Sequence, residues 1–164
     1  MIFEELIKEN RAEFVKKVTE IAEYLGVKPD WLAFLMWFET AHTLDHTIQN
    51  SIGATGLIQF MPRTAIGLGT TTTQLKAMSN VDQLDYVKKY LAPKRGQYKD
   101  WVDLYCMIFW PLAVGQPDSY VIASDKVAEQ NPIFDINKDK DITKAEIRQA
   151  LTKQIPKKYL SFFL

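Results

Sequence analysis

Apolar residues recur at helical spacing along most of the chain, and this pattern predicts a mainly helical protein. Within residues 2–25, apolar positions from Phe14 to Leu25 follow the three- and four-residue spacing of one buried stripe, which includes Val18 and Ile21. Gly26 is suited to end this helix, because glycine adopts the left-handed conformation of a helix C-terminus at little cost. We therefore expect a helix over 2–25.

A second helix is expected to be buried on most sides. Eight consecutive apolar residues, 31–38, precede Glu39, and Pro29 suits the first turn of this helix. Further helices are expected at 73–78, 81–91, 117–129 and 147–151, together with a buried helix over 101–114 that is kinked or stopped at Pro111. No alternation is long enough to predict a sheet, and no internal repeat is present.

The composition indicates an ordinary globular protein and excludes several classes. The chain has 164 residues, 47% hydrophobic and 24% charged, and twenty Lys and Arg balance twenty Asp and Glu, so a nucleic-acid partner is not expected. The single cysteine, Cys106, excludes a disulfide framework and is expected to be a buried, inert thiol. The apolar run 104–114 is too short for the roughly 20 residues of a membrane span, and the acidic start of the chain shows no secretory signal.

Glu39 is the strongest candidate for catalysis. It follows the apolar run directly, with Leu35 and Met36 on its own face of the helix. Burial in such surroundings raises the pKa of a carboxyl group and suits it to protonate a leaving oxygen. The alternative is a solvated Glu at a helix end. Asp45, six residues later, is expected to be a solvated loop acid, and His42 and His46 lack a third metal ligand nearby.

A glycine-containing loop follows this helix. Residues 46–62 contain no Asp, Glu, Lys or Arg, and they include Gly53-Ala54-Thr55-Gly56-Leu57-Ile58-Gln59-Phe60-Met61-Pro62. The two glycines permit close approach of a ligand to the backbone, and the Gln59 amide could donate to and accept from a sugar. By itself, such a loop is by default an ordinary turn.

Together, the glutamate and the loop resemble the catalytic domain of soluble lytic transglycosylases, in the lysozyme-like superfamily that includes goose-type lysozymes. The approach Gly26-Val27-x-Pro29-x-Trp31-Leu32 matches as well, and the resemblance covers roughly residues 20–116. It implies that Glu39 is catalytic and that the glycan is bound by further residues. These are Thr40, Ser51, Gly56, Gln59, Met61 and Trp110.

The sequence departs from this family at two places. Thr40 follows the glutamate where serine is usual, and Phe109-Trp110-Pro111 stands where the family has Tyr-Asn, as in a divergent phage-borne branch. In the family that tyrosine contacts the catalytic carboxyl group, and Trp110 is the nearest substitute. Trp110 is equally consistent with a packing role.

The resemblance implies cleavage of the β-1,4 bond between N-acetylmuramic acid and N-acetylglucosamine in peptidoglycan. One glutamate serves as acid and then as base, no cofactor is needed, and the product ends in a 1,6-anhydro sugar. A hydrolytic muramidase is the nearest alternative, and an inactive wall-binding or virion structural domain is the non-enzymatic one. We expect action on the bacterial cell wall, by a phage-encoded virion or lysis protein. The sequence does not fix an oligomeric state.

Residues 135–146 resemble the 12-residue calcium loop of EF-hand proteins. The ligand positions would be Asp135, Asn137, Asp139, Asp141, Thr143 and Glu146. Lys140 replaces the usual glycine at the sixth position, where a left-handed backbone costs about 1 kcal/mol or more. The alternative is a solvated acidic loop. We expect a structural Ca²⁺ here, on a lysozyme-like domain spanning 1–130 with the loop and a helical tail at 131–164.

Overall fold

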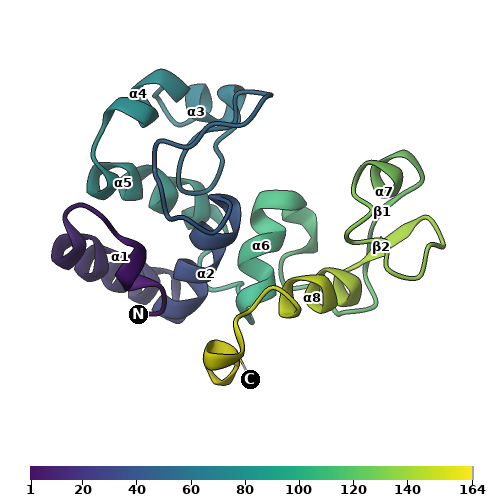
Figure 1. Cartoon of the computed structure of the whole chain (residues 1–164). Helices are drawn as coiled ribbons and strands as arrows, with labels where there is room; N and C mark the ends of the chain where they lie inside the picture. Colours follow the sequence, from purple (N-terminus) through teal and green to yellow (C-terminus); the bar gives the residue numbers. More distant parts are fainter. Residues whose placement is uncertain (164) are drawn as a thin grey trace. The chain divides into compact units, whose positions relative to one another are not determined.

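The computed structural model describes residues 1–163 and is mainly helical (Figure 1). The predicted mainly α class is therefore confirmed. The chain forms two compact units, Met1–Gly96 and Gln97–Leu164. The predicted boundary at residue 130, between a lysozyme-like domain and the loop and tail appended to it, falls inside the second unit.

Helices α1, α2 and α5 carry the core of the first unit. Helix α1 packs against both α2 and α5, and α3 lies beside α4 (Figure 1). Two 3-10 turns, η1 and η2, complete the unit. The bounds are η1 Glu4–Leu6, α1 Arg11–Leu25, α2 Pro29–Glu39, α3 Pro62–Gly67, α4 Thr72–Ala77, α5 Asn80–Leu91 and η2 Ala92–Lys94. The predictions of helices near 31–39, 73–78 and 81–91 are confirmed, whereas α3 was not predicted.

The helix predicted over 2–25 is too long. It begins at Arg11, because Asn10 takes a left-handed conformation with φ of 51°. Ile2, Phe3 and Ile7 are nevertheless buried in an irregular segment, in which Phe3 stacks on Trp37 with ring centroids 4.5 Å apart. The predicted apolar stripe is confirmed within α1, where Phe14, Val18 and Ile21 are buried. The end of α1 agrees with the prediction, since Gly26 has φ of 76°.

The second unit combines short helices with a two-stranded antiparallel sheet. The prediction that no sheet forms is wrong, because β1 pairs with β2 and places Ala123 opposite Ile142, with an irregularity in the register. The helix predicted over 117–129 is wrong in its first half, which contains β1. The bounds are α6 Trp101–Phe109, η3 Pro111–Ala113, β1 Val121–Ser124, α7 Lys126–Gln130, β2 Asp141–Thr143, α8 Lys144–Thr152 and η4 Lys157–Phe162.

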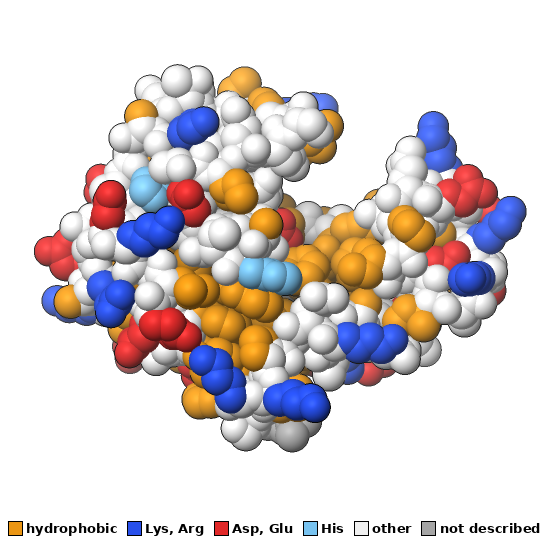
Figure 2. All heavy atoms as spheres, viewed as in Figure 1, with side chains coloured by type: hydrophobic (Ala, Val, Ile, Leu, Met, Phe, Trp, Pro, Cys, Tyr) orange, Lys and Arg blue, Asp and Glu red, His pale blue; other side chains and the backbone are white. Residues whose placement is uncertain are grey.

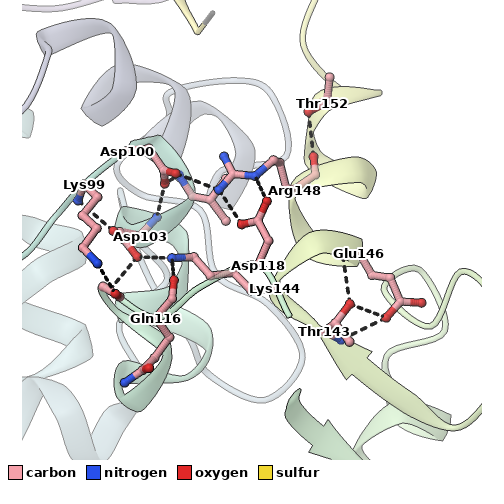
Figure 3. A network of polar contacts seen from close by, with 12 residues as sticks. Lys99, Asp100, Asp103, Gln116, Asp118, Thr143, Lys144, Glu146, Arg148 and Thr152 are labelled. Atoms are coloured by element: carbon pink, nitrogen blue, oxygen red, sulfur yellow. Dashed lines mark hydrogen bonds and ion pairs between the residues drawn. The ribbon is translucent and has the colours of Figure 1, made fainter. Parts of the chain in front are cut away.

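A buried ion pair ties α8 to α6. Lys144 Nζ lies 2.6 Å from Asp103 Oδ1, and the two side chains are only 2% and 0% exposed (Figure 3). Lys144 also donates to the Gln116 carbonyl, and Asp103 accepts from the backbone N–H groups of Lys99 and Gly115. The pair therefore holds three separate stretches of chain together. Removal of one partner lowers the free energy of unfolding strongly, because the remaining charge stays buried without a counter-charge.

Helix α6 also contains the single cysteine. Cys106 is fully buried, and burial is the main cause that raises the pKa of its thiol to about 12. This confirms the prediction of a buried thiol.

On the surface, acidic and basic side chains are interspersed over the face shown in Figure 2. In the described part of the chain, no helix has the length and apolar character of a membrane span.

Replacement of Lys144 by Met is expected to lower the free energy of unfolding by about 3–5 kcal/mol, because the buried Asp103 carboxylate loses its counter-charge. Urea unfolding followed by circular dichroism measures the change. Lys16→Met is the control, since Lys16 pairs with Glu20 at 4.0 Å on the surface, and its effect should stay below about 0.5 kcal/mol. An effect of Lys144→Met no larger than that of the control would contradict this account.

Candidate functional site

Glu39 is the last residue of α2, and a tight turn ends the helix behind it. The His42 N–H donates to the Trp37 carbonyl at 2.8 Å and the Ala41 N–H donates to the Phe38 carbonyl at 3.3 Å. With Ala41 left-handed at φ of 49°, this is a Schellman motif that uses alanine where glycine is usual. The turn fixes the direction in which the chain leaves α2 after Glu39.

Thr40 and the aromatic rings around Trp37 hold this turn. Thr40 is fully buried, and its hydroxyl donates to the Met36 carbonyl at 2.7 Å and accepts from the Leu44 N–H at 2.9 Å. The His42 ring stacks on Trp37 at 3.9 Å. Thr40 therefore orients the chain after Glu39, and its contact with a glycan stays a prediction.

The environment of Glu39 changes its acidity. Burial raises the pKa of its carboxyl group from 4.5 to about 7, as the apolar run before it predicted. A group with this pKa is present in both protonated and ionised forms near neutral pH. It can therefore donate a proton and take one back under the same conditions.

Tyr90 of α5 lies within electrostatic reach of Glu39, and the sequence analysis missed it. Burial, and then the charge of Glu39, raise the pKa of the Tyr90 hydroxyl. The Tyr90 ring packs edge-on against Phe60, with centroids 6.3 Å apart. The available signal was the spacing of Gln83, Val87 and Tyr90, which lie on one face of α5 at four- and three-residue intervals.

The loop after α2 folds into narrow antiparallel turns. Thr55 and Phe60 exchange two backbone hydrogen bonds of 3.0 and 2.8 Å, and the Gly56 N–H donates to the Ile48 carbonyl at 2.9 Å. Gly53 and Gly56 both have φ of 84°, as the turn prediction required. The loop therefore has a defined backbone along which an extended ligand could lie.

The predicted glycan-binding residues differ in exposure. Ser51 and Met61 are exposed, Gly56 is buried and Gln59 is partly buried. Gln59 Nε2 donates to the carbonyl groups of Gly56 at 3.1 Å and Ile48 at 3.4 Å, which leaves its Oε1 to accept from a ligand. Because Phe60 touches Tyr90, this loop and Glu39 belong to one neighbourhood of the first unit.

Trp110 belongs to the second unit. It follows the last residue of α6 and is partly buried, immediately before Pro111. The helix predicted over 101–114 thus stops at Phe109, which is one of the two outcomes expected at this proline, and not a kink. Its role toward a glycan stays a prediction.

Asp45, the next acidic residue after Glu39 in the sequence, is hydrogen-bonded to a neighbouring hydroxyl group. The Thr47 hydroxyl, which donates to Asp45 Oδ1 at 2.7 Å, lowers the pKa of Asp45 and keeps it ionised. Among the described residues, no three or more His, Cys, Asp or Glu side chains gather closely enough to hold a metal ion.

Residues 135–146 fold into a loop braced by its own acidic side chains. Asp135 Oδ2 accepts from the Lys140 N–H at 3.3 Å, Asn137 Oδ1 from the Asp139 N–H at 2.9 Å, and Asp139 Oδ1 from the Asp141 N–H at 2.9 Å. Lys140 is left-handed, with φ of 70°. It therefore adopts the backbone conformation for which the sixth position usually has glycine.

The ends of this loop meet through Glu146. Glu146 Oε2 accepts from the N–H and hydroxyl of Thr143, and this capping box begins α8. Glu146 Oε1 accepts from the Ile136 N–H at 3.2 Å, so the twelfth position reaches back to the second. Asp135 Oδ1 is buried without a hydrogen-bond partner, and it is the one such side-chain atom in the described part of the chain.

Neither a scan against protein-family models nor a search of curated proteins gives a match to this chain.

Glu39→Gln is expected to raise the free energy of unfolding by about 2–3 kcal/mol at pH 8 and by little at pH 4. Between pH 4.5 and about 7 the unfolded chain loses this proton while the folded chain keeps it, so wild-type stability falls as the pH rises. Urea unfolding at pH 4, 6 and 8 measures the difference. The exposed Glu13→Gln variant is the control, and the same difference at all three pH values would contradict burial of the Glu39 carboxyl group.

Proposed function

We propose that this protein is a peptidoglycan lytic transglycosylase, with Glu39 as its single acid and base. The observation that carries the proposal is the Glu39 carboxyl group, which sits at the end of an apolar helix with its pKa raised to about 7. The loop 46–62 beside it has the glycine and amide pattern expected for a glycan. The resemblance of this pattern to lytic transglycosylases supplies the reaction.

In the proposed reaction, the protonated Glu39 carboxyl group gives its proton to the glycosidic oxygen between N-acetylmuramic acid and N-acetylglucosamine. The bond from that oxygen to C1 of the muramic sugar breaks, and the N-acetylglucosamine leaves with the proton. The oxygen of the muramic 6-hydroxyl then bonds to C1, and the ionised Glu39 takes the proton that this hydroxyl releases. The product is a 1,6-anhydro sugar, no water is consumed, and Glu39 ends protonated as it began.

The remaining predicted residues would hold the glycan. Gln59 Oε1 is placed to accept from a sugar hydroxyl or N-acetyl N–H, since its Nε2 is already bonded within the loop. Ser51 and Met61 would contact the glycan from the exposed side of the same loop, and Gly56 would shape its backbone. Trp110 lies in the second unit, and its contact with a sugar ring stays a prediction from the resemblance. We also propose that the protein acts on the bacterial wall as a phage-encoded enzyme.

Glu39→Gln is expected to slow clearing of purified peptidoglycan at least about a hundredfold while binding is kept, because the amide cannot supply the proton. Turbidity measures clearing, and sedimentation with insoluble wall measures binding. Asp45→Asn is the matched control, as the nearest acid after Glu39 in the sequence, and should clear at the wild-type rate. Equal clearing by the Glu39→Gln variant and the wild type would reject the role of Glu39.

Mass spectrometry of the released fragments separates the alternatives. Anhydro ends, which lack one water, are expected. Reducing ends together with inactivity of Asp45→Asn would instead indicate a hydrolase with two carboxylates. Binding without any clearing by the wild type would indicate a wall-binding domain.

We further propose that residues 135–146 hold a structural Ca²⁺. The buried Asp135 Oδ1 lacks a partner, and Ca²⁺ prefers oxygen ligands of the kind that this loop supplies. Lys140 does not oppose this, because its ammonium group lies 3.8 Å from Glu129 Oε1, outside the loop. The acidic side chains of this loop are not gathered closely enough to hold an ion as they stand. Asp135, Asn137 and Asp139 would turn toward the ion to bind it, and Glu146 would exchange its backbone hydrogen bonds for it. The ion would neutralise the acidic side chains and cross-link the start of the loop to α8.

Calcium is expected to raise the melting temperature and EDTA to reverse the rise, because an ion that binds only the folded state stabilises it. Differential scanning calorimetry measures the shift. Asp135→Asn should abolish it, and the exposed Asp125→Asn variant, outside the loop, should retain it. The same melting temperature with calcium and with EDTA would refute the calcium proposal and leave the role of Glu39 untouched.

A further inference from the structure

Gln83 of α5 is a fully buried amide that hydrogen-bonds to three backbone positions of the first unit. Its Oε1 accepts from the Leu57 N–H at 2.6 Å. Its Nε2 donates to the carbonyl groups of Leu75 at 2.8 Å and His46 at 2.9 Å. Both polar atoms of the side chain are therefore used, and two of their partners, His46 and Leu57, lie in the loop 46–62.

The bond to Leu57 fixes a peptide plane that faces Gln59. The Leu57 N–H and the Gly56 carbonyl belong to one planar peptide group, so fixing one orients the other. The Gly56 carbonyl accepts from the backbone N–H of Gln59 at 3.0 Å and from its Nε2 at 3.1 Å. The direction of the Gln59 amide thus depends on where Gln83 holds this peptide.

Gly56 and Gln83 also fit each other sterically. A Cβ atom on residue 56 would collide with the carboxamide of Gln83, and Gly56 is left-handed at φ of 84°. Glycine is therefore required here for two reasons, one of which is the approach of Gln83. Gly69 has nearly the same φ, 83°, but open space around its Cβ position.

The same face of α5 contacts the neighbourhood of Glu39. Tyr90 lies seven residues after Gln83, packs against Phe60 and is affected by the charge of Glu39. One helix therefore sets both the loop that carries Gln59 and the surroundings of the proposed acid.

We infer that Gln83 is a positioning residue, which orients the Gly56–Leu57 peptide and through it the Gln59 amide for binding a peptidoglycan glycan. This inference rests on the proposed function for the identity of the ligand. Gln83 is fully buried, so it acts through Gln59 and does not touch the sugar. Because α2 and its own C-terminal turn hold Glu39, loss of Gln83 should weaken glycan binding more than the chemical step.

Gln83→Met keeps the size of the side chain and removes its hydrogen bonds. We expect KM for soluble, uncross-linked peptidoglycan chains to rise about tenfold or more, with kcat within about threefold of wild type, well below the melting temperature of each variant. Hydrogen exchange of the peptide covering 53–60 should become faster.

Asn80→Leu is the matched control, because Asn80 is a buried amide on the same helix. Its side chain hydrogen-bonds to Glu9 and Asn10 and forms no hydrogen bond with the loop. We expect a lower melting temperature with KM and loop exchange unchanged. A purely structural role for Gln83 predicts the same behaviour from both variants.

Gly56→Ala provides a second test if Gln83→Met fails to fold, since it displaces the Gln83 carboxamide without changing that residue. It should reproduce the rise in KM, whereas Gly69→Ala carries a similar left-handed strain and should not. If the wild type cleaves but KM and exchange stay unchanged in Gln83→Met and Gly56→Ala, the inference is overturned. If the wild type does not cleave, the proposed function fails, and the exchange data alone decide whether Gln83 holds the loop.

Discussion

Burial of α2 is the constraint on which the candidate site depends. Its residues from Leu32 to Trp37 are buried, so the helix cannot rotate to bring its last residue into bulk water without exposing them. The raised pKa of Glu39 follows from this packing, with burial as its cause. The turn behind it adds direction, because Thr40 and the stacked rings of Trp37 and His42 fix the chain that leaves the helix.

The sequence predicted well those features that depend on neighbours in the chain. The end of α1 at Gly26, the start of α2 at Pro29 and the stop of α6 before Pro111 were all expected, because each residue imposes its own backbone geometry. The burial of Cys106 also followed from the apolar run around it.

Predictions failed where contacts distant in the sequence decide the structure. The segment 2–10 has apolar residues at helical spacing, but its burial is achieved by Phe3 stacking on Trp37, and the left-handed Asn10 separates it from α1. The strands escaped notice because they have three and four residues, too few for an alternating pattern. Gln83 and Tyr90 were missed because their partners are remote: Leu57 lies 26 residues from Gln83. The sequence of α5 alone does not predict that Leu57 or Glu39 lies beside this helix.

The single thiol of the chain has a practical consequence. Thiol reagents attack the thiolate, and a fully buried cysteine with a pKa of about 12 offers almost none at neutral pH. Labelling of Cys106 therefore requires α6 to open, and no other cysteine competes for the reagent. The rate of Cys106 labelling therefore reports the opening of the second unit. Mass spectrometry can follow this rate in the protein without any substitution.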